Sequence, residues 1–215
     1  IHPDGFAWNL KKDEPFQTPE AVLVYSDQGL NGMSQTYHKL YRTRLARGYW
    51  RDRERPVLIN NWEATFMNFD QEKILDIAKA AGELGVELMV LDDGWFGHRD
   101  DATSSLGDWY PDKRKLPEGI AGVACRVTEL GMKFGLWFEP EMISKDSDLY
   151  REHPDWMIGA PDRHLCQGRN QYVLDFTKPE VVEWIGDRME EILSGAPVSY
   201  VKWDMNRSMS DVFST

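Results

Sequence analysis

Five short apolar runs alternate along the chain with longer segments of helical periodicity. Each run ends in acids, tryptophans or amides, which a strand buried on both faces does not normally contain. The runs cover residues 57–62 (VLINNW), 87–95 (ELMVLDDGW), 134–141 (FGLWFEPE), 172–176 (YVLDF) and 200–206 (YVKWDMN). We therefore predict five parallel β-strands whose carboxyl ends bring polar residues together in one site.

Helical patterns fill three of the gaps between these strands. Apolar residues recur every three to four positions over residues 70–85, 117–131 and 177–195, and a glycine closes each pattern. Alternation of strand and helix indicates parallel strands joined by right-handed crossovers. The pattern therefore predicts an α/β protein.

An open doubly wound sheet and a (β/α)8 barrel, the TIM barrel, both fit this alternation. The barrel is favoured because no Gly-x-Gly-x-x-Gly follows the first strand, and because polar residues end nearly every strand. Only about the first five of eight strands are present, so we expect a fragment. The chain also begins at Ile1 without methionine, which leaves its natural start open.

Residues 1–55 lack this rhythm and form a separate region, which precedes the barrel of residues 56–215. Aromatic residues there lie among glycine, proline and charged residues. One strand is predicted at residues 21–25 and one helix at residues 34–47.

Composition narrows the possible partners and the compartment. The formal net charge of −11 disfavours nucleic acid and anionic membrane surfaces as partners. No signal peptide and no apolar run long enough to span a bilayer is evident. Cys125 and Cys166 match no pairing motif, as is typical of a reduced, cytoplasmic protein. Nine tryptophans, several next to acids, suit either core packing or the flat faces of sugar rings.

Lys202 and Asp204 are the strongest candidates for chemistry. They are two residues apart on a predicted strand and therefore face the same side. A lysine beside a carboxylate keeps it ionised at neutral pH, as a glycosidase nucleophile requires. A salt bridge at the barrel rim fits the same pattern.

Asp92 and Asp93 are adjacent at a predicted strand end, where two carboxylates repel each other unless they are satisfied. Neighbouring sugar hydroxyls, basic side chains or a divalent metal would satisfy them, and so would a structural role at the start of a turn. For a metal, His98 is the single ligand candidate nearby, and the five histidines show no ligand spacing. No Ser-His-Asp arrangement and no phosphate loop is evident.

Two further residues have both a structural and a functional interpretation. Trp137, just before Glu139 and Glu141, can form a pocket wall or part of the core. Arg169, in the loop before the fourth strand, is either an exposed loop residue or a partner for a carboxylate or a hydroxyl pair.

Long motifs in the chain resemble those of glycoside hydrolase family 36, the α-galactosidases. They are LDDGWFG (91–97), GLWFEPEM (135–142), GRNQYVLDF (168–176) and YVKWDMNR (200–207). Residues 17–42 resemble the family's junction between a large N-terminal β-sandwich and the barrel. The resemblance implies that residues 1–55 are the end of that sandwich and a connector, and that residues 56–215 are an incomplete catalytic barrel.

The resemblance also implies roles for site residues. Asp204 is the nucleophile, and Lys202 binds the sugar and holds that carboxylate ionised. The other substrate-binding residues are Asp92, Asp93, Trp137, Arg169, Trp95 and Asn206. The family uses no metal and no organic cofactor.

The implied activity is hydrolysis of terminal α-linked galactose, mainly α-1,6, from oligosaccharides such as melibiose and raffinose. It proceeds with retention by double displacement. The acid/base lies beyond residue 215, and Glu139 or Glu141 is the weaker candidate within the chain. We expect the isolated piece to be inactive and poorly folded because an open barrel leaves two unpaired edges. The family is often tetrameric, which predicts a homo-oligomer.

Two alternatives remain open. One is a relative that binds galactose without hydrolysing it, and the other is an α-N-acetylgalactosaminidase or galactosyltransferase of the same fold. Space beside the 2-position of the sugar would distinguish an N-acetylgalactosaminidase.

Overall fold

The computed structural model describes residues 7–160, 162–209 and 213–214, and the chain divides into two units. These are Ile1–Arg55 and Pro56–Thr215.

In the first unit, helix α1 spans Gly29–Leu40 and continues into a π-helical turn at Tyr41–Leu45. The helix predicted at residues 34–47 therefore forms, but it begins earlier than predicted. The strand predicted at residues 21–25 is wrong, because these residues adopt no regular secondary structure. The origin of this unit in a β-sandwich stays a prediction.

The second unit is built on a four-stranded parallel sheet. Its strands are β1 (Leu58–Asn60), β2 (Leu88–Leu91), β3 (Lys133–Phe138) and β6 (Val198–Trp203). They are hydrogen-bonded in the order β1-β2-β3-β6, which is their order in the chain. A doubly wound sheet reverses its order at a switch point, whereas a barrel does not. The predicted α/β class is confirmed, and the order is that of a barrel segment.

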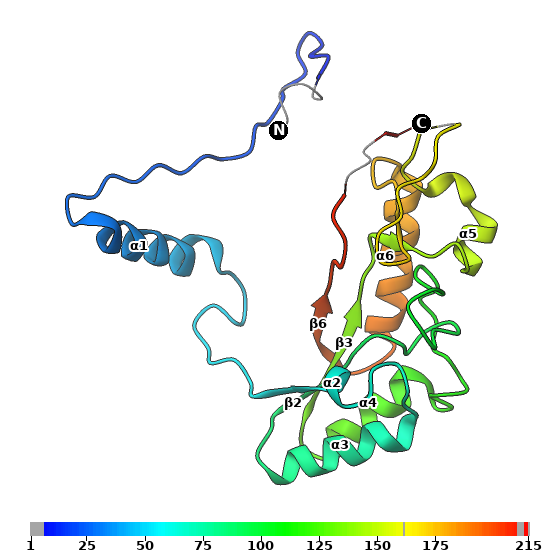
Figure 1. Cartoon of the computed structure of the whole chain (residues 1–215). Helices are drawn as coiled ribbons and strands as arrows, with labels where there is room; N and C mark the ends of the chain where they lie inside the picture. The colour runs from blue at the N-terminus through cyan, green and yellow to red at the C-terminus, as the bar shows by residue number, and fades with distance from the viewer. Residues whose placement is uncertain (1–6, 161, 210–212, 215) are drawn as a thin grey trace. The chain divides into compact units, whose positions relative to one another are not determined.

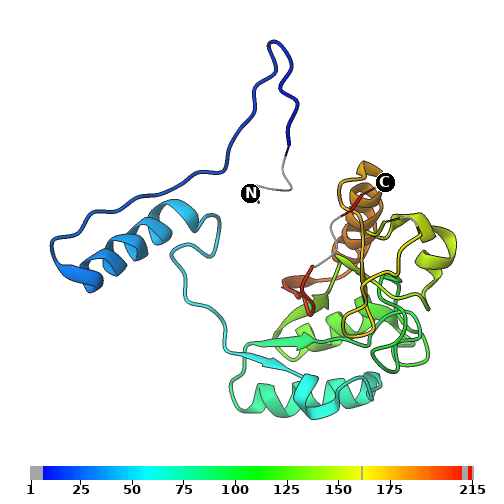
Figure 2. The same cartoon turned by 45° about the horizontal axis from the view of Figure 1, so that its top comes forward.

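Three crossover helices connect these strands. They are α3 (Gln71–Glu83), α4 (Gly119–Glu129) and α6 (Pro179–Ser194), each within two residues of its predicted bounds. Figures 1 and 2 show them gathered along one side of the strands. Each helix buries one apolar stripe, as α3 does with Ile74, Ala78 and Ala81. Among the described residues, every helix is too short or too polar to cross a lipid bilayer.

The strand predicted at residues 172–176 does not belong to the parallel sheet. Instead β5 (Tyr172–Val173) pairs antiparallel with β4 (Met142–Ile143), and β3 pairs directly with β6. Among the residues that the structure describes, the parallel sheet therefore has four strands rather than the predicted five. The prediction failed because Tyr172 and Val173 are buried against the core, and an apolar run reports burial rather than membership of a particular sheet.

This correction makes residues 139–178 one long connection from β3 to α6. Besides β4 and β5 it contains α5 (Asp148–Glu152) and a 3-10 turn at Pro154–Trp156. A second long connection, residues 92–118, leads from β2 to α4. Both connections begin at carboxyl ends of neighbouring strands, where parallel α/β folds place their sites.

The two connections are bound to each other, and aromatic residues from the connection between β2 and α4 and from β3 pack together in one cluster. The Asp108 carboxylate accepts the backbone N–H groups of Asp148 and Leu149, each at 3.0 Å. The aromatic cluster consists of Trp95, Phe96, Trp109, Trp137 and Phe138, with ring centroids 4.6–6.3 Å apart. The carboxyl ends of β2 and β3 therefore lie on a rigid base.

The start of α3 provides a test of its local structure. Asp70 caps this helix, because its carboxylate accepts the Lys73 backbone N–H at 2.9 Å. Asp70→Ala should cost about 1 kcal/mol and speed hydrogen exchange of the first-turn amides roughly fivefold. Asp76→Ala, at an exposed position of the same helix, is the matched control. Equal exchange rates in the two variants would contradict the capping role.

Candidate active site

A cavity of about 290 Å³ lies at the carboxyl ends of the strands. It is lined by Trp62, Met67, Asp92, Asp93, Arg99, Ala102, Trp137, Glu139, Arg169, Gln171, Lys202, Asp204 and Asn206. All the residues predicted for the site line it except Trp95. Side chains from β3, from β6 and from the two long connections, together with residues that follow β1 and β6, thus converge on one volume.

The Asp204 carboxylate directly follows β6 and is held by three donors. Its Oδ2 accepts the Trp137 indole N–H at 3.0 Å and the Asn206 amide N–H at 2.7 Å. Its Oδ1 accepts the Met205 backbone N–H at 2.9 Å. Partial burial acts to raise the pKa of Asp204, but these hydrogen bonds outweigh it and hold the pKa below its usual value. The group is therefore an oriented, ionised carboxylate at neutral pH.

The structure corrects the partner predicted for Lys202. Its Nζ donates to Asp92 Oδ2 at 2.7 Å, and its charge is only a minor contribution to the low pKa of Asp204. Strands β2 and β6 flank β3, so they are about 10 Å apart. A long lysine side chain spans that distance, so spacing along one strand did not reveal its partner.

Two asparagines at the end of β1 complete the surroundings of Asp92. The Asn60 side chain donates to Asp92 Oδ2, and Asn61 Oδ1 accepts the Asp92 backbone N–H at 2.8 Å. The same Asn60 side chain accepts the Trp62 backbone N–H at 2.7 Å. The asparagine pair thus links β1 to β2 and places Trp62 in the cavity wall. Sequence reasoning noted this polar strand end but gave Trp62 no role.

Asp93 has a cation of its own, which sequence reasoning missed. Arg99 Nε and NH2 donate to Asp93 Oδ1 and Oδ2 at 2.6 and 2.9 Å, and both side chains are buried. Burial raises the pKa of Asp93, and the bidentate bond to Arg99 opposes that rise. The repulsion expected between two adjacent carboxylates was the available signal, since it called for a basic partner.

Glu139, which follows β3, is fully buried in the cavity wall. Its Oε1 accepts the Asn206 backbone N–H at 2.5 Å, and its Oε2 accepts the Gln171 amide N–H at 3.0 Å. Burial raises the pKa of Glu139. Glu141 lies outside the cavity lining, and both its oxygens accept the Trp203 indole N–H at 3.0 Å. Protein donors therefore engage both carboxylates that were weaker candidates for the acid/base.

Arg169 reaches the site from a tight turn. Gly168 and Gln171 exchange backbone hydrogen bonds, and Arg169 and Asn170 between them have φ of 51° and 61°. Positive φ at both central residues is the conformation of a type I′ turn. The guanidinium donates to Asn206 Oδ1 at 2.8 Å. Arg169 is thus linked through one amide to the carboxylate of Asp204.

Trp95 does not line the cavity, in contrast to its prediction as a substrate-binding residue. Its ring is fully buried in the aromatic cluster, and its indole N–H donates to the Trp137 carbonyl at 2.9 Å. The position of Trp137 therefore depends on Trp95. Local sequence could not distinguish the roles of these two tryptophans, because each lies beside acidic residues near the end of an apolar run.

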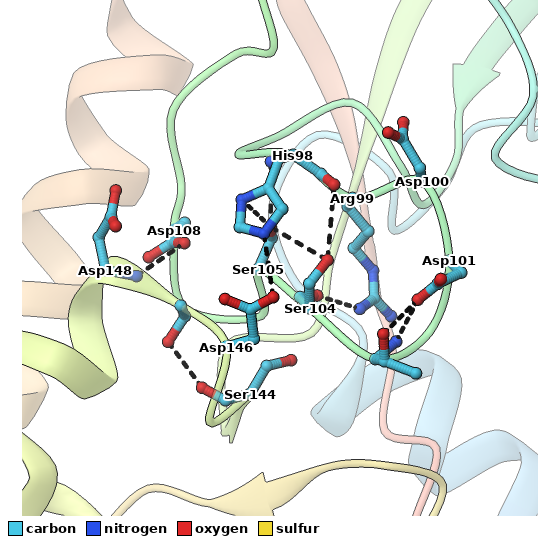
Figure 3. Close-up of polar contacts among 12 residues, drawn as sticks. His98, Arg99, Asp100, Asp101, Ser104, Ser105, Asp108, Ser144, Asp146 and Asp148 are labelled. Carbon is cyan, nitrogen blue, oxygen red and sulfur yellow. Dashed lines mark hydrogen bonds and ion pairs between the residues drawn. The ribbon is translucent and has the colours of Figure 1, made fainter.

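His98 also lies away from the cavity, in the polar network of Figure 3. Its Nδ1 is 3.2 Å from Ser105 Oγ, and its Nε2 is 3.3 Å from Asp146 Oδ2. Ser105 is fully buried and its hydroxyl accepts the His98 backbone N–H, so this serine cannot act as an accessible nucleophile. Within the described ranges, no group of three or more His, Cys, Asp or Glu side chains could hold a metal ion.

Comparison with known proteins identifies the family. The family model described as Melibiase matches residues 15–215. The chain belongs to the melibiase family. It is 60% identical to α-galactosidase AgaA of Geobacillus stearothermophilus over all of its length and 30% of that protein's. It is 53% identical to α-galactosidase Mel36A of Lactobacillus acidophilus, over 99% of this chain and 29% of that one.

A solved melibiase-family structure also matches the fold. The crystal structure of GH36 α-galactosidase AgaA from Geobacillus stearothermophilus aligns with a TM-score of 0.87 and 61% identity, over 89% of this chain and 27% of that chain. A variant of the same protein has been crystallised in complex with raffinose. The chain thus spans about 30% of the length of these relatives. We use the term full-length protein for a chain of the relatives' length that contains this segment.

The ion pair between Lys202 and Asp92 can be tested by stability. Lys202→Met should lower the thermal midpoint of the full-length protein by a few degrees, because it leaves the buried Asp92 carboxylate without a cation. Adding Asp92→Asn should restore part of that loss. Lys79→Met, at an exposed site on α3, is the control in a calorimetric scan. A midpoint unchanged by Lys202→Met would show that the pair does not stabilise the fold.

Proposed function

We propose that this chain contributes the nucleophile and much of the sugar-binding wall to a retaining α-galactosidase. Its substrates would be oligosaccharides with terminal α-linked galactose, mainly α-1,6, such as melibiose and raffinose. The observation that supports this most directly is the ionised Asp204 carboxylate, held by three hydrogen bonds in the cavity. Membership of the melibiase family and the raffinose complex of the relative AgaA support the choice of substrate.

In this mechanism Asp204 attacks the anomeric carbon of galactose and forms a covalent galactosyl–enzyme. The bond to the leaving oxygen breaks as a second carboxylic acid protonates that oxygen. The resulting carboxylate then takes a proton from water as that water attacks the anomeric carbon. The bond from this carbon to Asp204 breaks, which regenerates the Asp204 carboxylate and releases galactose with retained configuration. Because Glu139 and Glu141 are engaged by protein donors, we propose that the acid/base comes from a residue outside these 215.

The rest of the cavity suits the binding of a hexose. The carboxylates of Asp92 and Asp93 can accept hydroxyl groups, and Lys202 has N–H donors beyond the one that binds Asp92. Trp137 and Trp62 contribute aromatic surface to the same wall. Assembly into a homo-oligomer stays a prediction from the family resemblance.

The role of Asp204 predicts a chemical rescue. In the full-length protein, Asp204→Ala should abolish hydrolysis of p-nitrophenyl α-galactoside, because no covalent intermediate can form. Added azide should restore part of the rate and give galactosyl azide, since a small anion can occupy the vacated space. Asp187→Ala, on the exposed surface of α6, is the control. A wild-type rate in Asp204→Ala would overturn the assignment, and galactose binding without hydrolysis by the unmodified protein would favour a non-catalytic relative.

The low pKa of Asp204 makes a prediction about pH. The nucleophile must be ionised, so activity is present above the pKa of Asp204 and is lost as the pH falls through it. Asn206→Ala removes a donor to the carboxylate, raises that pKa and moves the acid limb of kcat/KM to higher pH. Met205→Ala keeps its backbone N–H and should leave the acid limb in place. An unmoved acid limb in Asn206→Ala would show that Asn206 does not control the ionisation of Asp204.

A further inference from the structure

The two adjacent carboxylates at the end of β2 are each bound to a different cation. Lys202 binds Asp92 from β6, whereas Arg99 binds Asp93 from the connection between β2 and α4. The Arg99 side chain is buried and lines the cavity. Its bond to Asp93 is bidentate, so it fixes the plane of the carboxylate as well as its charge.

Arg99 is itself held by the protein at its guanidinium and at its backbone. Its NH1 donates to the Ser104 carbonyl at 2.6 Å, which leaves the guanidinium little freedom to rotate away from Asp93. Its own carbonyl accepts the ammonium of Lys115 at 2.7 Å. Lys115 also donates to the carbonyls of Met67 and Gly94, each at 3.0 Å. Several independent hydrogen bonds therefore fix the position of Arg99.

The loop that contains Arg99 is further bound to the neighbouring connection, as Figure 3 shows. The Ser105 backbone N–H donates to the Asp146 carbonyl at 2.7 Å, and His98 bridges Ser105 and Asp146 through its two ring nitrogens. Gly97 has a φ of 57°, and a Cβ there would lie 2.7 Å from Ser105 Cβ. The close approach of Gly97 and Ser105 thus excludes other residues at position 97. These contacts hold the loop, and with it the Arg99 side chain, in one position beside the cavity.

We propose that Arg99 is a positioning residue of the active site, which holds Asp93 ionised and in one orientation so that it can accept hydroxyl groups of the sugar. This inference rests on the proposed function. Each carboxylate oxygen has two lone-pair sites, and Arg99 occupies one on each. The Gly94 backbone N–H also donates to this carboxylate, so the acceptor positions that remain are few and fixed in direction, and each can take a sugar hydroxyl.

The electrostatic surroundings explain why Asp93 needs this partner. Asp93 is buried, its neighbour Asp92 is also anionic, and the charge of Lys202 is already paired with Asp92. Lys115 is bound to backbone carbonyls and to Asp100 rather than to Asp93. Without Arg99, desolvation and the charge of Asp92 would both favour the protonated form. A protonated Asp93 would carry an O–H donor and offer fewer acceptor positions to hydroxyl hydrogens.

A double-mutant cycle in the full-length protein tests this role. Arg99→Met should lower kcat/KM for p-nitrophenyl α-galactoside by about 10- to 100-fold, mainly through KM, and move the acid limb to higher pH. Arg99→Lys should retain part of the activity, because it keeps the charge but loses the bidentate geometry. In an Asp93→Asn background, Arg99→Met should change kcat/KM less than threefold. Arg114→Met, which alters an exposed arginine of the same connection, is the control.

Infrared spectroscopy gives a second measurement that does not need turnover. Arg99→Met should show the carbonyl band of a protonated carboxyl group at neutral pH, and the band should be absent after Asp93→Asn is added. A loss of activity equally large with and without Asp93→Asn would overturn the inference, because Arg99 would then act on the loop alone. Absence of the band would also overturn it. If the unmodified protein has no α-galactosidase activity, the proposed function fails while the infrared comparison still decides the ionisation of Asp93.

Discussion

Four carboxylates stand at the ends of these strands, three of them buried and that of Asp204 partly buried, and each finds a partner within the protein. Asp92 and Asp93 obtain cations from different parts of the fold, whereas Asp204 and Glu139 obtain neutral donors. The cost of burying an unsatisfied carboxylate is large. Few arrangements of strands and loops satisfy all four groups at once, and this requirement fixes the geometry of the cavity.

The different partners give these carboxylates different properties. Neutral hydrogen bonds keep the pKa of Asp204 low without neutralising its charge, so the oxygen atoms remain nucleophilic. Burial without a cation raises the pKa of Glu139, and the hydrogen bond that its Oε1 accepts from the Asn206 backbone N–H positions Asn206. Asp93 combines burial with a bidentate cation and stays rigid. Under the proposed function, one cavity would therefore contain groups for attack, for orientation and for sugar binding.

Much of this architecture was predictable because it depends on local pattern. The helices α3, α4 and α6 have a regular apolar period closed by glycine, and their bounds were found within two residues. The position of the cavity followed from polar residues at strand ends. Pairing across space was not predictable: β5 resembles a barrel strand but pairs with β4, and Lys202 binds Asp92 two strands away. Arg99 lies in a loop without periodicity, so only its chemistry could have indicated it.

The central claim is that Asp204 is the nucleophile of a retaining galactosidase, and trapping tests it most directly. The full-length protein would be treated with an activated fluorinated galactosyl donor, which slows breakdown of the covalent intermediate, and then digested for mass spectrometry. The account predicts one fluorogalactosyl group on the peptide that contains Asp204, attached at that residue. Attachment at Glu139 or another carboxylate, or no adduct while the donor is turned over, would contradict it.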